Sequence, residues 1–201
     1  MTATIDNSVK SKKEHCDEIM NAASNNYWGF GGISENKEEA FRLYMQAAGL
    51  GCPEAYYEIG SMYRTGANNI KDYNKALAYF KTGARLGFVL CYAGMYDLFK
   101  EIGQIDNARR CWDKFIDNCT DNDHGAAYRC YEYIRECIQE NTEPLRAKDM
   151  LKYKKIMIAS GEEILQRYLS YKEQGLNVDD DRFIKGRLHY ITPSSLFTMA
   201  T

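Results

Sequence analysis

The 201-residue chain is short of the residues and motifs that most enzymes use. It has only three histidines, and no known catalytic motif joins one of them to a nucleophile. G-x-S-x-G, H-E-x-x-H and a glycine-rich phosphate loop are all missing. We therefore expect a protein that is not an enzyme and that carries no cofactor.

A strong excess of one charge and a long apolar run are missing as well. The formal net charge is -2 and the isoelectric point is about 6.0, so nothing attracts the chain to nucleic acid or to an anionic membrane. The longest apolar run, Gly87–Tyr96, is too short to span a bilayer, and the polar stretch Met1–His15 lacks the apolar core of a secretion signal. These features predict a cytoplasmic protein that binds neither nucleic acid nor membrane.

Only three prolines interrupt the chain, and the spacing of its apolar residues is that of helices. Asp72 can cap a helix that Gly87 ends, because an aspartate oxygen accepts from a free N–H and glycine adopts the left-handed conformation cheaply. Within it, positions i, i+3, i+4, i+7 and i+8 share one face and are small or aromatic. These residues are Ala76, Tyr79, Phe80, Gly83 and Ala84.

A shorter helix precedes this one and pairs with it. Its face is formed by Tyr56, Ile59, Gly60 and Tyr63, again at i, i+3, i+4 and i+7. Gly60 would let the two helices approach closely. The sequence Gly66-Ala-Asn-Asn separates them, so the stretch 54–87 predicts a helical hairpin.

The pattern of the second helix occurs twice more. One copy, 36 residues earlier, follows the capping residue Asn36, and another, 32 residues later, follows the capping residue Asp106. The copies comprise Ala40, Leu43, Tyr44, Ala47 and Ala48, and then Ala108, Cys111, Trp112, Phe115 and Ile116. Because one hairpin cannot bury its apolar face alone, such a repeat predicts a stack of hairpins.

The central hairpin, A-Y-Y-E-I-G-S-M-Y-R-T-G followed by K-D-Y-N-K-A-L-A-Y-F-K-T-G-A-R-L-G, resembles the Sel-one-like (Sel1-like) repeat family. This resemblance implies a right-handed α-solenoid that serves as an interaction scaffold and has no catalytic residues. A secreted branch of the family closes each hairpin with a disulfide. Cys91 occupies one such position, but Gly83 occupies the partner position, so the resemblance implies no disulfide there.

We therefore expect an all-α, right-handed α-solenoid of about four antiparallel helical hairpins with a C-terminal capping helix. It forms a single domain over residues 1–201. The repeats span residues 14–51, 54–87 and 88–118, followed by a divergent fourth repeat over 126–160 and a cap over 162–201.

Seven cysteines, an odd number in a chain expected in a reducing compartment, predict free buried thiols. Cys130 and Cys137 would share a helix face near His124, but no C-x-x-C pair is present, so we expect no metal site. The acidic residues around Asp121 lack the ligand order of a calcium loop and predict a solvated loop.

In stacked hairpins the first helix of each pair lines the concave side, and its exposed positions are the candidate binding surface. Trp28 and Tyr57 are the best anchors, because aromatic side chains dominate protein interfaces. A competing interpretation buries Trp28 under the N-terminal segment and leaves the charges as ordinary surface. The candidate partner-binding residues are Asn21, Asn25, Trp28, Tyr57, Ser61, Arg64, Asp97, Lys100, Tyr128, Glu132 and Arg135.

Three functions fit this sequence to different degrees. The first is a non-catalytic scaffold or adaptor that binds another protein through the concave face. The alternative is an immunity protein or inhibitor that neutralises a bacterial toxin, a role that small size and mild acidity suit. An enzyme is the third, and it would need a concave cluster of carboxylates with strongly perturbed pKa values.

Overall fold

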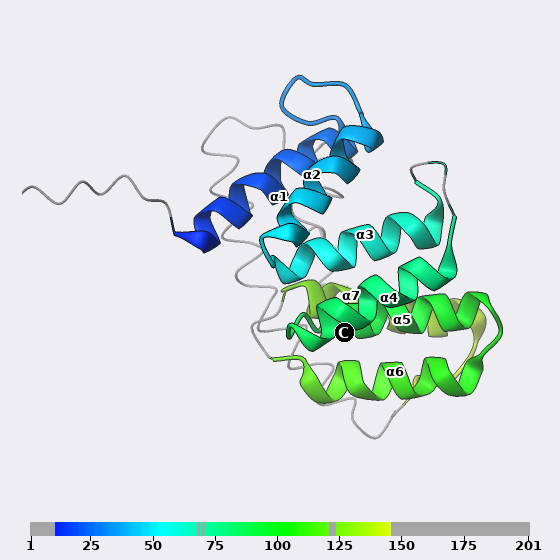
Figure 1. The fold of residues 1–201 in the computed structure, drawn as a ribbon. Helices are drawn as coiled ribbons and strands as arrows, with labels where there is room; N and C mark the ends of the chain where they lie inside the picture. The colour runs from blue at the N-terminus through cyan, green and yellow to red at the C-terminus, as the bar shows by residue number, and fades with distance from the viewer. Residues whose placement is uncertain (1–10, 68, 70, 121–123, 146–201) are drawn as a thin grey trace, which may run out of the picture. The chain divides into compact units, whose positions relative to one another are not determined.

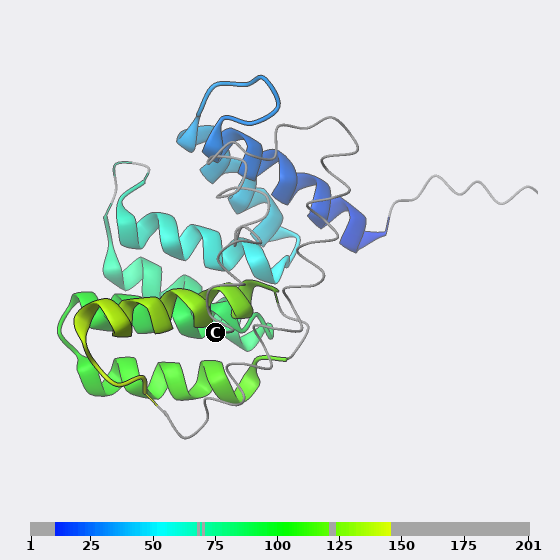
Figure 2. The ribbon, with the colours of Figure 1, turned by 180° about the vertical axis from the view of Figure 1, so that it is seen from behind.

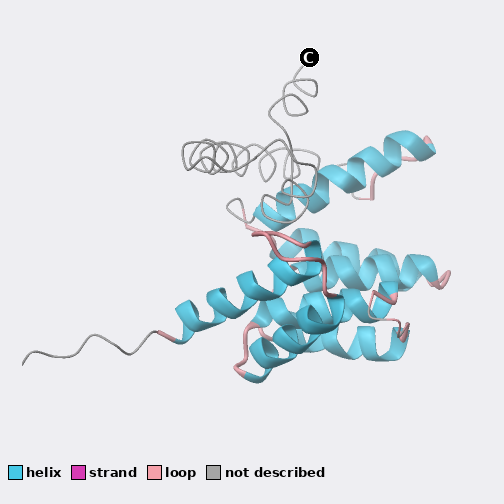
Figure 3. Cartoon of the chain, turned by 90° about the horizontal axis from the view of Figure 1, so that it is seen from above, coloured by secondary structure: helices cyan, strands magenta, loops and turns pink. Residues whose placement is uncertain are grey.

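The structure is a computed structural model that describes residues 11–67, 69, 71–120 and 124–145 (Figure 1). Every regular element in these residues is an α-helix (Figure 3). The chain divides into two compact units, which we call unit one (Met1–Leu86) and unit two (Gly87–Thr201). None of the described helices has the length and apolarity needed to cross a membrane.

Unit one is built from two helical hairpins. Its helices are α1 (Lys12–Trp28), α2 (Lys37–Gly49), α3 (Pro53–Thr65) and α4 (Tyr73–Arg85). Helix α1 packs along α2, α3 packs along α4, and α2 also contacts α3 (Figures 1 and 2). The two hairpins are therefore stacked through α2 and α3, as the repeat pattern predicts.

Side-chain caps explain where the helices of unit one begin. Asn36 and Asp72 accept hydrogen bonds from the N–H groups of Glu39 at 2.9 Å and Lys75 at 3.0 Å, as predicted. Ser11 caps α1 through a reciprocal pair of bonds with Glu14, which satisfies two otherwise free N–H groups.

Gly60 confirms the predicted close approach of α3 and α4. A Cβ atom at this position would lie 2.7 Å from two ring carbons of Phe80, closer than real Cβ contacts. Phe80 and Ile59 are both fully buried beside it. The core of this hairpin therefore depends on the missing side chain of Gly60.

Unit two contains α5 (Leu90–Glu101), α6 (Ile105–Asn118) and α7 (His124–Glu140). Helix α5 packs along α6 and contacts α7. All five residues predicted as the inner face of α6 are buried, and Trp112, Phe115 and Ile116 are completely so. The predicted cap at Asp106 is wrong: the helix starts one residue earlier, and Gln104 precedes it without a side-chain hydrogen bond to the backbone.

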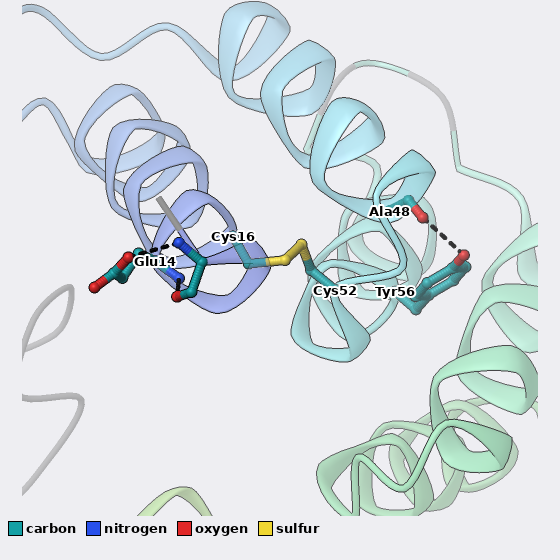
Figure 4. Close-up of a disulfide and its surroundings, with 6 residues drawn as sticks. Glu14, Cys16, Ala48, Cys52 and Tyr56 are labelled. Carbon is teal, nitrogen blue, oxygen red and sulfur yellow. Dashed lines mark hydrogen bonds between the residues drawn. A yellow bond between two sulfur atoms is a disulfide. The ribbon is translucent and has the colours of Figure 1, made fainter. Parts of the chain in front are cut away.

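The prediction that all seven cysteines are free thiols is also wrong for one pair. Cys16 on α1 and Cys52, the residue before α3, form a disulfide with Cα atoms 5.9 Å apart (Figure 4). Beside it, the hydroxyl of Tyr56 donates a hydrogen bond to the carbonyl of Ala48 at 2.9 Å, which also fixes the turn between α2 and α3. The other five cysteines are free and buried, as predicted.

Residues 146–160 of the predicted fourth repeat and the whole predicted cap over 162–201 lie outside the described residues. The described part of the fourth repeat contains α7, which ends at Glu140.

Candidate partner-binding surfaces

The predicted binding residues of unit one lie on α1 and α3 and remain accessible. Asn21 is exposed, and the other five are half-buried: Asn25, Trp28, Tyr57, Ser61 and Arg64. None of them belongs to the buried core. Whether they contact a partner stays a prediction.

Trp28 stands at the end of α1 against a second aromatic ring. Its ring centroid is 4.9 Å from that of Tyr27, with the planes at 69°. The ammonium of Lys37 lies 5.7 Å from the centre of the Tyr27 ring and pairs with Glu35 at 2.8 Å. This end of unit one therefore presents two packed aromatic rings beside a cation that is already paired.

The ring of Tyr57, on α3, packs against a core residue. Its ring centroid lies 5.9 Å from that of the fully buried Phe80. A half-buried aromatic ring that rests on a fixed core residue loses little conformational freedom on binding, which is a property of interface anchors.

Glu58, also on α3, is absent from the binding residues predicted from the sequence. Burial raises the pKa of its carboxyl group to about 7. Burial likewise raises the pKa values of Tyr27 and Tyr44, and the negative charge of Glu58 adds to both shifts. Burial is the main cause of all three shifts.

The sequence did contain a signal for Glu58. It stands directly before the core residue Ile59 and three residues after Ala55, both completely buried. A charge at the edge of an apolar helix face is a candidate for a perturbed pKa. The enzyme alternative would require a cluster of such carboxylates, and Glu58 is a single one.

In unit two, charged side chains of α7 form ion pairs with two of the predicted residues on α5, Asp97 and Lys100. Asp97 accepts a hydrogen bond from Nη2 of Arg129 at 2.5 Å. Lys100 lies 3.5 Å from a carboxylate oxygen of Glu136 and 3.2 Å from one of Glu140. Both residues of α5 are thus engaged in ion pairs that attach α7 to α5.

Arg129 is the centre of this network and is absent from the residues predicted from the sequence. Its side chain is 10% exposed, and its Nη1 lies 3.5 Å from Glu136. The guanidinium also lies 5.7 Å from the ring centre of Tyr96 and 5.4 Å from that of Trp112. A charge this deeply buried needs such partners, so the network is part of the core of unit two.

The remaining predicted residues of unit two lie on α7. Tyr128 and Glu132 are half-buried, and the side chain of Arg135 lies outside the described part. A cleft of about 170 Å3 opens beside the network. Its lining mixes cations with carboxylates: Lys100, Arg109, Glu136, Glu140 and Glu143. In the described ranges no group of three or more His, Cys, Asp or Glu side chains has an arrangement suited to a metal ion.

Comparison with known proteins shows a similarity of fold. No family model matches the chain, and no curated protein sequence matches it. A solved structure does: the Sel1 repeat protein from Oxalobacter formigenes superimposes with a TM-score of 0.52 at 18% sequence identity. The match covers 94% of this chain and 77% of the other. It confirms the predicted all-α fold of stacked helical hairpins.

Proposed function

We propose that this chain, whose fold is that of a Sel1-like repeat protein, is a non-catalytic scaffold that binds another protein. The binding surface is the accessible side of the first helices of its repeats. In unit one these are α1 and α3, which carry Asn21, Asn25, Trp28, Tyr57, Ser61 and Arg64.

The observation that carries this proposal is the pair of aromatic side chains on those helices. Trp28 and Tyr57 are half-buried, and each rests on a second ring, Tyr27 and Phe80 respectively. Rings that are already positioned give contact area at low entropic cost, and tryptophan and tyrosine are enriched among residues that dominate binding energy.

We propose the cytoplasm as the compartment, on the basis of five cysteines that are buried free thiols. The Cys16–Cys52 bond would then form only where oxidant is present. The partner class is a protein, since the balanced charge of the chain favours neither nucleic acid nor an anionic membrane.

The test is an affinity capture from the host, comparing wild type with Trp28→Ala/Tyr57→Ala. We expect a protein that the wild type retains and the double mutant loses, with a loss of about thirtyfold in affinity if each ring contributes about 1 kcal/mol. A matched control is Met45→Ala/Tyr73→Ala, which removes an exposed and a half-buried side chain from the second helices α2 and α4.

The captured protein also decides between the two roles. A toxin whose activity falls on binding would make the chain an inhibitor, whereas a component of a larger assembly would make it an adaptor. Equal capture by wild type and Trp28→Ala/Tyr57→Ala would contradict the proposed surface. Capture of no protein would contradict the scaffold function.

A further inference from the structure

We propose that Cys16 and Cys52 form a reversible redox site for small thiols and disulfides of the glutathione type. Cys16 exchanges with the small molecule, and Cys52 closes the bond within the chain. The inference goes beyond the proposed function, because the site needs no partner protein. Three observations carry it: the unequal exposure of the two cysteines, the place of Cys52 at the start of a helix, and a lysine beside both.

Solvent reaches the two cysteines to different degrees. Cys16 is half-buried on α1, whereas Cys52, the residue before α3, is completely buried (Figure 4). The other five cysteines are free thiols with at most 9% exposure. A thiol from solution is therefore directed to the sulfur of Cys16.

Cys52 is placed where a thiolate is stabilised. It occupies the N-cap position of α3, and in the disulfide its side chain accepts no hydrogen bond from the first turn of that helix. A side-chain acceptor at this position binds free N–H groups, and the positive end of the helix favours an anion there. Reduction therefore lets the Cys52 thiolate cap α3, and a thiolate stabilised in this way leaves readily when the bond is attacked.

Lys12 lies beside both cysteines. It precedes Cys16 by four positions on α1, so the two side chains share one face of the helix. Its Nζ also lies 3.5 Å from the place that a Cβ of Gly51 would take, next to Cys52 in the chain. A nearby ammonium favours the thiolate, which is the form that attacks disulfides.

Reduction begins when the thiolate of glutathione attacks Sγ of Cys16. A bond forms between the glutathione sulfur and Cys16, the bond from Cys16 to Cys52 breaks, and the electron pair leaves on the sulfur of Cys52. A second glutathione attacks the sulfur of the first, releases the Cys16 thiolate and leaves as glutathione disulfide. The chain gains two electrons and the protons of the two thiols, and glutathione loses both. Oxidation by glutathione disulfide runs through the same mixed disulfide in reverse.

The redox state of this site acts on α1, because little of this helix is buried. Of its 17 residues only Ile19 and Ala23 are buried, whereas α2 buries four of its 13. The disulfide therefore supplies a large share of the attachment at the start of α1. Reduction frees that end of the helix, and oxidation fastens it again.

The experiment incubates the reduced full chain with glutathione disulfide, blocks the remaining thiols with N-ethylmaleimide and locates glutathione by peptide mass spectrometry. In Cys52→Ser we expect glutathione on Cys16. In Cys16→Ser we expect Cys52 to react at least about tenfold more slowly, because it is buried. Wild type should form the Cys16–Cys52 bond and leave the five buried thiols free. Equal rates at the two cysteines, or no glutathione on Cys16, would overturn the site.

A second measurement needs no variant, so it decides the proposal even if a serine variant fails to fold. Oxidised wild type is equilibrated with millimolar glutathione at increasing ratios of thiol to disulfide, and the fraction with an intact Cys16–Cys52 bond is measured. We expect half of the chains to be reduced within the range of ratios that glutathione buffers reach, whereas a purely structural bond stays oxidised in reduced glutathione alone. The latter result would overturn the proposal.

The part of Lys12 is tested in Cys52→Ser with hydroxyethyl disulfide, a neutral reagent whose own charge plays no part. Adding Lys12→Gln should slow the reaction of Cys16 by about threefold, because the thiolate loses its neighbouring cation. Lys81→Gln, at an exposed position of α4, is the matched control and should leave the rate unchanged. Equal rates with the two substitutions would overturn the part of the proposal that concerns Lys12.

Discussion

At the residue scale, the packing of unit one depends on the missing side chain at one position as much as on the buried side chains around it. Gly60 leaves out a side chain, so the Phe80 ring can occupy the space between α3 and α4. Glu58, two residues earlier, is half-buried, and burial raises the pKa of its carboxyl group to about 7. Both residues lie on one turn of one helix, and the packing around that turn determines the properties of both.

We predict that Gly60→Leu destabilises unit one by about 1–3 kcal/mol, because the new side chain must displace Phe80. Urea unfolding followed by circular dichroism would measure this loss. Gly49→Leu is the matched control: apart from its chain neighbours and the nearby backbone of its own helix, no heavy atom lies within 4 Å of a Cβ at that position. An equal or smaller effect of Gly60→Leu than of Gly49→Leu would contradict the role assigned to Gly60.

Residues of this kind differ in how far a sequence predicts them. The caps at Asn36 and Asp72 and the close approach at Gly60 follow from local spacing and were predicted correctly. The cap at Asp106 was predicted wrongly, because the local sequence is equally compatible with a helix that starts one or two positions earlier. Glu58 was missed because the burial of a charged side chain beside an apolar helix face is determined by tertiary packing, which local spacing does not show.

At the scale of elements, a disulfide and a hydrogen bond both hold one end of the first hairpin. The Cys16–Cys52 disulfide attaches the first turns of α1 to the turn before α3, and the Tyr56 hydroxyl attaches α3 to the end of α2. The sequence could not pair these cysteines, since they are 36 residues apart and meet only when α1 folds back on α2. The odd number of cysteines pointed to free thiols, and for five of them that was correct.

Reduction of this disulfide should destabilise unit one by at most about 4 kcal/mol, the loop entropy expected for a closure of this length. Hydrogen exchange measured with and without reductant should show faster exchange in α1 than in α4. In Cys16→Ala/Cys52→Ala the exchange of α1 should already be fast, and reductant should change nothing. Equal protection of α1 in the oxidised and reduced wild type would show that the bond adds no stability.

Helix α7 is held to α5 by charge, which makes Arg129 its most sensitive position. Arg129→Ala should destabilise unit two by about 3 kcal/mol, because Asp97 loses its cation and two aromatic rings lose a stacked guanidinium. Hydrogen exchange of α5 and α7 peptides would report the loss. Arg110→Ala, at an exposed position of α6, should stay within about 0.5 kcal/mol of wild type. A similar small effect of Arg129→Ala would show that apolar packing alone holds α7.

At the scale of the whole molecule, the repeat pattern predicted the class of fold better than it predicted the binding surface. Periodic apolar residues determine which faces of the helices are buried, and that is sufficient for stacked hairpins. The charged candidates are different, because an exposed position on an isolated helix can meet an opposite charge from a neighbouring one. Asp97 and Lys100 form such ion pairs, whereas Trp28 and Tyr57 in unit one remain accessible.

The position of the disulfide also determines how the chain carries mechanical load. A pull on the N-terminal end passes from Cys16 through the sulfur atoms to Cys52, so most of α1 and all of α2 lie in a closed ring that bears no tension. The segment between Cys16 and Cys52, which are 36 positions apart, would add about 120 Å to the extended chain if it were released. An oxidised molecule is therefore shorter at full stretch than a reduced one, and α3 is the first helix of unit one that such a force unwinds end to end.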